Sequence, residues 1–124
     1  MGIYSDVAIM VKADALKRLP ANVLEQLEQF DDQQVTPDGT IFAADMIKWG
    51  YTWCEPIQAA LRVLGSENYR IVTACHDYPD ANDDEGDWVD NPWNAYKSVS
   101  VSVKWRPAVY EWVETTPNTA TTDQ

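Results

Sequence analysis

An acidic stretch rich in aromatic residues, at positions 75–96, constrains this chain more than any other feature. No Lys or Arg occurs between Arg70 and Lys97. Seven carboxylates fall inside the stretch, namely Asp77, Asp80, Asp83, Asp84, Glu85, Asp87 and Asp90. Four large aromatic residues are interleaved with them, namely Tyr78, Trp88, Trp93 and Tyr96. Acids alone are typical of a solvated loop, whereas aromatic rings gain by burial. We therefore predict a loop that its rings fix to the protein body while its carboxylates face solvent.

Chain length and net charge limit the classes of function. The 124 residues are expected to form one domain at 1–113, followed by a disordered tail at 114–124 that has no apolar period. The net charge of −11 repels nucleic acid and anionic membranes, so neither is an expected partner. The same charge favours a basic protein or a bivalent cation. The alternative is that the acidity only keeps the protein soluble.

Cysteine usage and the N-terminal residues indicate a cytoplasmic protein. Cys54 and Cys75 give neither a metal-binding spacing nor a disulfide framework, and they suit a reducing compartment. Residues 1–12 lack the parts of a signal peptide. No apolar run reaches the roughly 20 residues that cross a bilayer.

Apolar periodicity predicts an α+β two-layer sandwich, in which a four-stranded sheet carries two helices on one face. The expected order is strand, helix, strand, helix, strand, strand. The predicted strands are 3–11, 40–49, 69–75 and 97–105, and the predicted helices are 13–30, interrupted at Pro20, and 53–64. Residues 31–40 are predicted to be a polar turn region. One residue conflicts with the pattern, because Asp45 shares a strand face with Ile41, Ala43 and Ile47.

Two motif tests on the acidic stretch lead to no known metal or catalytic site. Read as a calcium loop from Asp80, the stretch has Glu85 where glycine is required and Asn91 where glutamate is required. Looser binding of a divalent cation stays open.

His76 is the single histidine, and it lies beside Asp77, which suits a general base with an orienting carboxylate. Adjacent strand residues point to opposite sides, however, so Cys75 does not face His76. No nucleophile elbow, phosphate loop or zinc motif is present. We predict no catalytic residue, no metal and no cofactor. A small enzyme that uses His76 and Asp77 with Cys54 is the alternative.

A resemblance to small acidic proteins of bacteriophages covers about residues 41–90. It rests on the run Asp45-Met46-Ile47-Lys48-Trp49, a following helix, the strand start Tyr69-Arg70-Ile71 and the acidic stretch that ends Gly86-Asp87-Trp88. Gly50 departs from the pattern, since those proteins tend to have Tyr there. Similar phage proteins include inhibitors of host defence, such as anti-CRISPR and anti-restriction proteins, and some of them mimic DNA with ordered carboxylates. The resemblance implies an interaction role.

Together these features predict a phage-type accessory protein that binds and inhibits or modulates a basic host protein through an acidic face. The predicted partner-binding residues are Asp77, Asp80, Asp83, Asp84, Glu85, Asp87, Trp88, Asp90 and Trp93. Trp88 and Trp93 would anchor a partner or pack the loop on the sheet, and both roles stay open. An assembly module whose acidity serves only solubility is a further alternative.

Overall fold

The computed structural model describes residues 4–48, 51–75, 84–98 and 102–105. The elements in chain order are β1 (Tyr4–Lys12), α1 (Ala13–Leu16), α2 (Ala21–Leu27), β2 (Asp32–Val35), β3 (Gly39–Lys48), α3 (Tyr51–Leu64), the 3₁₀ turn η1 (Ser66–Asn68), β4 (Tyr69–Cys75), β5 (Tyr96–Ser98) and β6 (Ser102–Lys104). The predicted tail at 114–124 and the end of the predicted domain lie outside the described residues.

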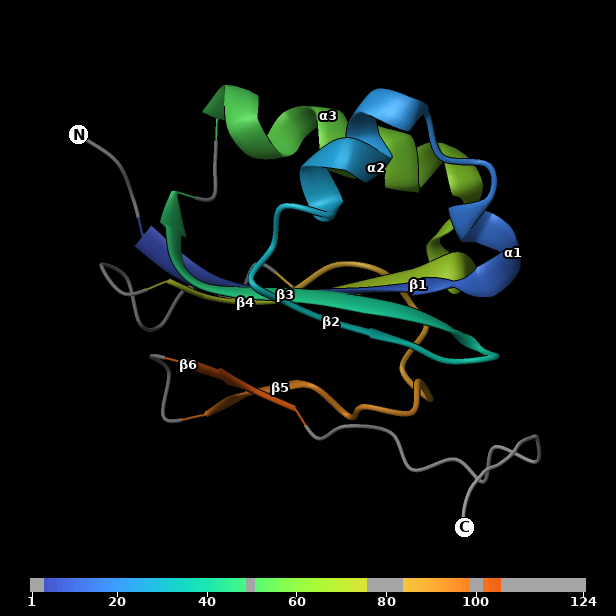
Figure 1. Cartoon of the computed structure of the whole chain (residues 1–124). Coiled ribbons are helices and arrows are strands. Elements are labelled where there is room, and N and C mark those ends of the chain that lie inside the picture. Colours follow the sequence, from blue (N-terminus) through green and yellow to red (C-terminus); the bar gives the residue numbers. More distant parts are fainter. Residues whose placement is uncertain (1–3, 49–50, 76–83, 99–101, 106–124) are drawn as a thin grey trace, which may run out of the picture.

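A four-stranded antiparallel sheet forms the centre of the fold, in the order β2-β3-β1-β4. The helices α1, α2 and α3 cover one face of this sheet (Figure 1). The short hairpin β5–β6 lies under the opposite face as a separate two-stranded sheet. The predicted α+β class, with a four-stranded sheet and helices, is thus confirmed. The predicted order of strand, helix, strand, helix, strand, strand is wrong, because two strands, β2 and β3, lie between α2 and α3. The hairpin adds a partial layer on the face opposite to the helices (Figure 1).

Strand β1 lies inside the sheet because its side chains are apolar on both faces. Val7, Ile9 and Val11 pack with the helices, and none is more than 1% exposed. Ala8 and Met10 face the hairpin and are fully buried. The sheet therefore separates two cores, and each is built from alternate residues of the same strands.

The helical layer follows the predicted stripes of apolar residues. Pro20 is the N-cap of α2, so the chain turns there, and Val23 and Leu27 point to the sheet. In α3, Ile57 and Leu61 are fully buried in the same core. Gly65 follows α3 with φ of 101°, a value that favours glycine and ends the helix as predicted. No helix in the described ranges is long and apolar enough to cross a membrane.

Two predictions about which residues form the sheet were wrong. Residues 31–40, predicted to be a turn region, contain β2, which pairs with β3 from Asp32↔Ala43 to Val35↔Thr40. Strand β2 is short and mostly polar, so its extended conformation depends on its pairing with β3. The strand predicted at 97–105 contributes instead to β5 and β6, which pair with each other. Strand alternation is the same in either sheet, so the pattern did not distinguish them.

A bulge in β3 changes which residues share a face. Val7 pairs with Ala44 and Ser5 pairs with Ile47, so β3 has one more residue than β1 across this step. Ile47 therefore packs beside the helical core, and the prediction that it shares a face with Ile41 was wrong. The bulge lies at Asp45 and Met46, where the periodicity and the chemistry of Asp45 conflicted.

Candidate functional site

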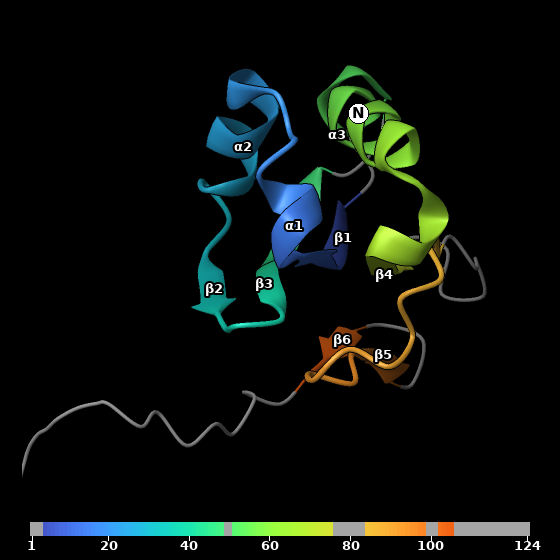
Figure 2. The same ribbon diagram turned by 90° about the vertical axis from the view of Figure 1, so that its right-hand side faces the viewer.

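The predicted acidic site is only partly within the described residues. Asp77, Asp80 and Asp83 lie outside them, as does His76, and nothing is described of the Cys54 side chain. The remaining predicted residues lie on a segment, 84–93, that follows the outer edge of β4 and then passes under the sheet. Figure 2 shows this segment beside β4, at the border of the sheet opposite to β2.

Backbone hydrogen bonds attach residues 84–88 to β4. The Ile71 and Glu85 amides each donate to the other's carbonyl, at 2.6 and 2.9 Å. Trp88 N–H donates to the Tyr69 carbonyl at 3.1 Å. Between them Gly86 has φ of 90°, and a Cβ there would lie 2.2 Å from the Tyr69 carbonyl oxygen. Glycine is therefore required for the segment to approach β4 so closely.

Several carboxylates of this segment bond to the protein itself. The Asp84 carboxylate accepts from the Thr73 amide at 3.2 Å and forms an ion pair with Arg70 at 3.3 Å. The Asp87 carboxylate accepts from the Ser66 hydroxyl at 2.7 Å. Both side chains still have exposed surface. Their charges are thus fixed in position at the edge of β4, whereas the sequence predicted that the carboxylates would only face solvent.

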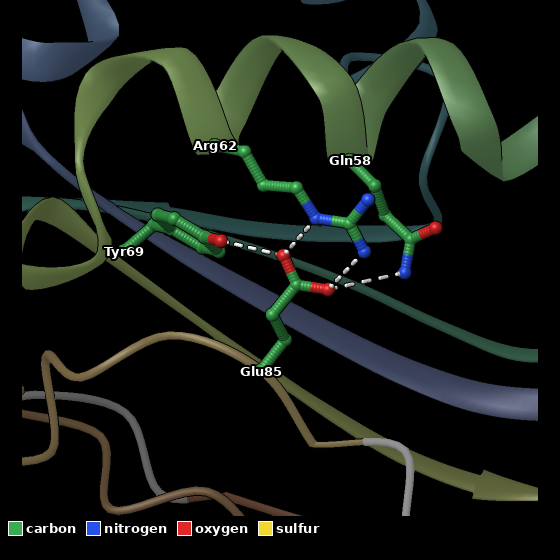
Figure 3. A network of polar contacts seen from close by, with 4 residues as sticks. All are labelled: Gln58, Arg62, Tyr69 and Glu85. Atoms are coloured by element: carbon green, nitrogen blue, oxygen red, sulfur yellow. Dashed lines mark hydrogen bonds and ion pairs between the residues drawn. The ribbon is translucent and has the colours of Figure 1, made fainter.

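Glu85 is the centre of a polar network that joins α3 to β4 (Figure 3). Its two carboxylate oxygens accept from Arg62 Nε and Nη2, each at 2.9 Å, and one of them also accepts from the Tyr69 hydroxyl at 2.5 Å. The Gln58 amide makes a longer contact of 3.5 Å. Hydrogen bonding by Arg62 lowers the pKa of Glu85. Partial burial and the bond to Glu85 raise the pKa of Tyr69.

The hydrogen bonds and the pKa directions of Glu85 and Tyr69 fit a structural role for the network. The lowered pKa keeps Glu85 ionised, and the raised pKa keeps Tyr69 protonated, so neither group exchanges a proton near neutral pH. A general acid or base needs a pKa near the working pH. The network instead links the segment at 84–88 to both α3 and β4.

Trp88 and Trp93 pack on the sheet face that carries the hairpin. Their relative exposures are 6% and 0%, and their rings meet edge to face with centroids 6.0 Å apart. Trp93 Nε1 donates to Gln34 Oε1 of β2 at 2.5 Å. Lys12 Nζ lies 5.9 Å from the Trp88 ring centroid. The prediction that aromatic rings fix this stretch to the protein body is confirmed for Trp88 and Trp93.

A second group of acids, which the predicted site did not include, lies where β2 and β3 meet. We name Asp31, Asp32 and Asp45 the β2–β3 acidic cluster. Asp45 is exposed, but partial desolvation of its carboxylate, and then the negative charges of Asp6, Asp32 and Asp31, raise its pKa, while Lys104 lowers it. Like charges are therefore concentrated at this corner of the sheet. The one signal in the sequence was Asp45 on an apolar strand face.

A pocket of about 140 Å³ opens beside this cluster, and its walls come from the sheet and from the end of the hairpin. Its lining residues are Val7, Asp32, Ala43, Asp45, Val103, Lys104 and Trp105. Another pocket, of about 280 Å³, lies by Asp90 and is lined by Lys12, Asp38, Trp88, Asp90 and Pro92. Within the described part of the chain, no group of three His, Cys, Asp or Glu side chains is arranged to hold a metal ion.

Comparison of the chain with protein-family models, with curated protein sequences and with solved structures found no match.

Proposed function

We propose that this protein is a non-enzymatic interaction protein, of the accessory type that phages produce, which binds a basic host protein through its acidic surface. A nucleic-acid-binding host protein suits this role, because carboxylates fixed on a folded surface can occupy sites that bind phosphates. Binding there would inhibit the host protein by competition with nucleic acid.

The observation that carries the proposal is the exposure of the acids. Wherever burial is described, every Asp and Glu is exposed except Asp6 and Glu85. With a net charge of −11, the protein therefore has a strongly negative surface. Such a surface accelerates association with a basic partner and repels other anions.

The predicted residues have different roles in this proposal, according to their exposure and hydrogen bonds. Asp87 and Asp90 are exposed and would meet a partner directly, together with the β2–β3 acidic cluster. Glu85 would act indirectly, since its carboxylate is bonded to Arg62 and Tyr69. Buried Trp88 and Trp93 offer little ring surface to a partner, so we assign them the role of holding the segment on the sheet. A surface ordered in advance spares conformational entropy on binding.

Affinity capture from a bacterial lysate at low and high salt tests this function. We expect a basic protein to be captured at low salt and released at high salt, and added duplex DNA to compete with it. The variant Asp31→Asn/Asp32→Asn/Asp45→Asn should capture less of it. A control variant, Asp14→Asn/Glu25→Gln/Glu55→Gln, removes the same charge from the helical layer. Capture that is insensitive to salt and unchanged in both variants would contradict the proposal.

A further inference from the structure

The two border strands of the sheet differ in how their outer edges are covered. The edge of β4 is occupied by the chain itself, through the Ile71–Glu85 bridge and the Trp88 amide. The Asp84 carboxylate accepts a further β4 amide, that of Thr73. In the described ranges, β2 pairs with β3 alone. Figure 2 shows β2 at the open border of the sheet.

The backbone of β2 can therefore accept another strand. In an antiparallel pair, alternate residues direct their N–H and C=O groups away from the neighbour strand. Border strands in proteins are usually protected by Lys, Pro or a bulge. Strand β2, Asp-Gln-Gln-Val, has none of these within it. Its last residue, Val35, is 68% exposed, so its apolar side chain is accessible at this border of the sheet.

The chemistry of the two sides of β2 defines the segment that would pair with it. Asp32 lines the pocket that also contains Asp45, on the face of the sheet that carries the hairpin. Gln34 is on the same face, because it bonds to Trp93. Gln33 and Val35 alternate to the helical face, where Gln33 Nε2 donates to the Glu28 carbonyl at 3.0 Å. An added strand would thus place alternate side chains beside carboxylates and beside Val35.

We propose that β2 binds an extended, basic segment of a partner protein as a fifth strand of the sheet. This inference rests on the proposed function and specifies its mode of binding. Alternate Lys or Arg side chains of the segment lie along the β2–β3 acidic cluster, and the intervening apolar side chains lie beside Val35. Main-chain hydrogen bonds supply affinity in this mode, and the alternate side chains supply specificity.

The charge of β2 disfavours a second copy of this chain as the occupant. Two copies would each bring a net charge of −11, and their acidic clusters would lie at the same junction. A basic segment replaces this repulsion by attraction. Sedimentation at rising protein concentration tests whether the chain dimerises. A dimer that is dissociated by the Val35→Lys substitution would overturn the choice of a basic partner segment as the occupant.

The test uses the full chain and a short acetylated peptide of alternating lysine and valine. Two matched peptides serve as controls: one is N-methylated at alternate backbone amides, and the other has glutamate in place of lysine. NMR with amide exchange follows Asp32–Val35. We expect the lysine peptide to slow exchange in β2 by about tenfold or more, and N-methylation to weaken its binding by at least about tenfold.

Charge variants separate attraction from strand pairing. The Asp31→Asn/Asp32→Asn variant should bind the lysine peptide several-fold more weakly, whereas Asp14→Asn/Glu25→Gln should bind it as wild type does. The glutamate peptide should not bind.

Equal binding of the methylated and unmethylated peptides, without protection of β2, would overturn strand pairing while leaving an acidic interaction surface in place. If neither peptide binds but a basic lysate protein is captured, strand pairing is again overturned and the proposed function survives. If no basic ligand of either kind binds at low salt, both are overturned.

Discussion

Arg62 and Glu85 form a two-point contact in which the guanidinium Nε and Nη2 donate to the two carboxylate oxygens, each at 2.9 Å. The residues belong to the last turn of α3 and to the segment beside β4, so the contact joins elements that are 23 positions apart. Arg62 is 61% exposed and Glu85 is 21% exposed, which leaves the pair open to solvent on one side. The contact therefore positions the segment more than it stabilises the whole fold.

Replacement of Glu85 by Gln should lower the free energy of unfolding by about 1 kcal/mol. The neutral amide keeps the shape but loses the charge-assisted bonds from Arg62 and from the Tyr69 hydroxyl. Urea unfolding measures the change. Glu25→Gln, on an exposed position of α2, is the control and should have a smaller effect. Equal stability of the two variants would show that the network contributes nothing.

The stabilisation by Glu85 should depend on pH in the acid range. The pKa of Glu85 is lowered in the folded protein from its ordinary value of 4.5. A lowered pKa means that the ionised group favours folding above pH 4.5, and that this contribution is lost as the pH falls below 4.5 toward the folded-state pKa. Thermal unfolding of wild type and Glu85→Gln should differ constantly from neutral pH to about pH 5 and converge below it. A difference that grows in acid would contradict the assignment.

The elements predicted correctly are those that local sequence determines. Strand β1 is apolar from Val7 to Val11, and α3 has its stripe at helical spacing and Gly65 at its end. Strand β2 was missed because its four residues carry one apolar side chain, Val35, and because its conformation depends on β3. The pattern of apolar residues along the sequence does not show which strand a polar segment will pair with.

The site was predicted less well than the fold, because charge clusters are tertiary. The acids at 77–90 are close in sequence, but Glu85 bonds to Arg62 and Tyr69, which come from α3 and β4. Asp31 and Asp32 meet Asp45 only when β2 pairs with β3. The burial of Trp88 and Trp93 was predictable, because aromatic rings within an acidic stretch are stabilised by packing on the protein body. The face of the sheet on which they pack was not predictable from the sequence.

Replacement of Gly86 by Ala should detach the segment at 84–88 from β4. The new Cβ would lie 2.2 Å from the Tyr69 carbonyl oxygen, and φ of 90° adds backbone strain, so we expect a loss of about 2 kcal/mol or more. Gly65→Ala is the matched control, since its φ is also positive but its Cβ meets the flexible Glu67 carboxylate at 3.0 Å. Amide exchange at Ile71 should accelerate in the first variant alone. Unchanged exchange there would contradict the role of Gly86.

Replacement of Trp93 by Ala should destabilise the protein by about 3–5 kcal/mol, the usual range for a buried aromatic residue. The ring is fully buried between the sheet and the hairpin and bonds to Gln34. Near-ultraviolet circular dichroism and urea unfolding measure the loss. Val89→Ala, at a position that is 67% exposed, should change stability by less than about 0.5 kcal/mol. Similar values for the two variants would mean that the hairpin face is not a core.

Replacement of Asp45 by Asn should stabilise the protein at neutral pH, by about 0.5 kcal/mol because solvent screens this exposed group. Burial and the neighbouring Asp6, Asp32 and Asp31 raise its pKa above the ordinary 3.8, so the ionised form opposes folding. As the pH falls through the raised pKa toward 3.8, wild type takes up a proton and loses this penalty, and the advantage of the variant should disappear. Thermal unfolding from neutral to acid pH measures the difference, with Glu25→Gln as the control.

The Asp45→Asn variant should also bind the lysine peptide more weakly. A gain in stability together with a loss of binding would show that Asp45 serves interaction with a partner and not stability. A lower melting temperature at neutral pH would instead show that Lys104 outweighs the like charges.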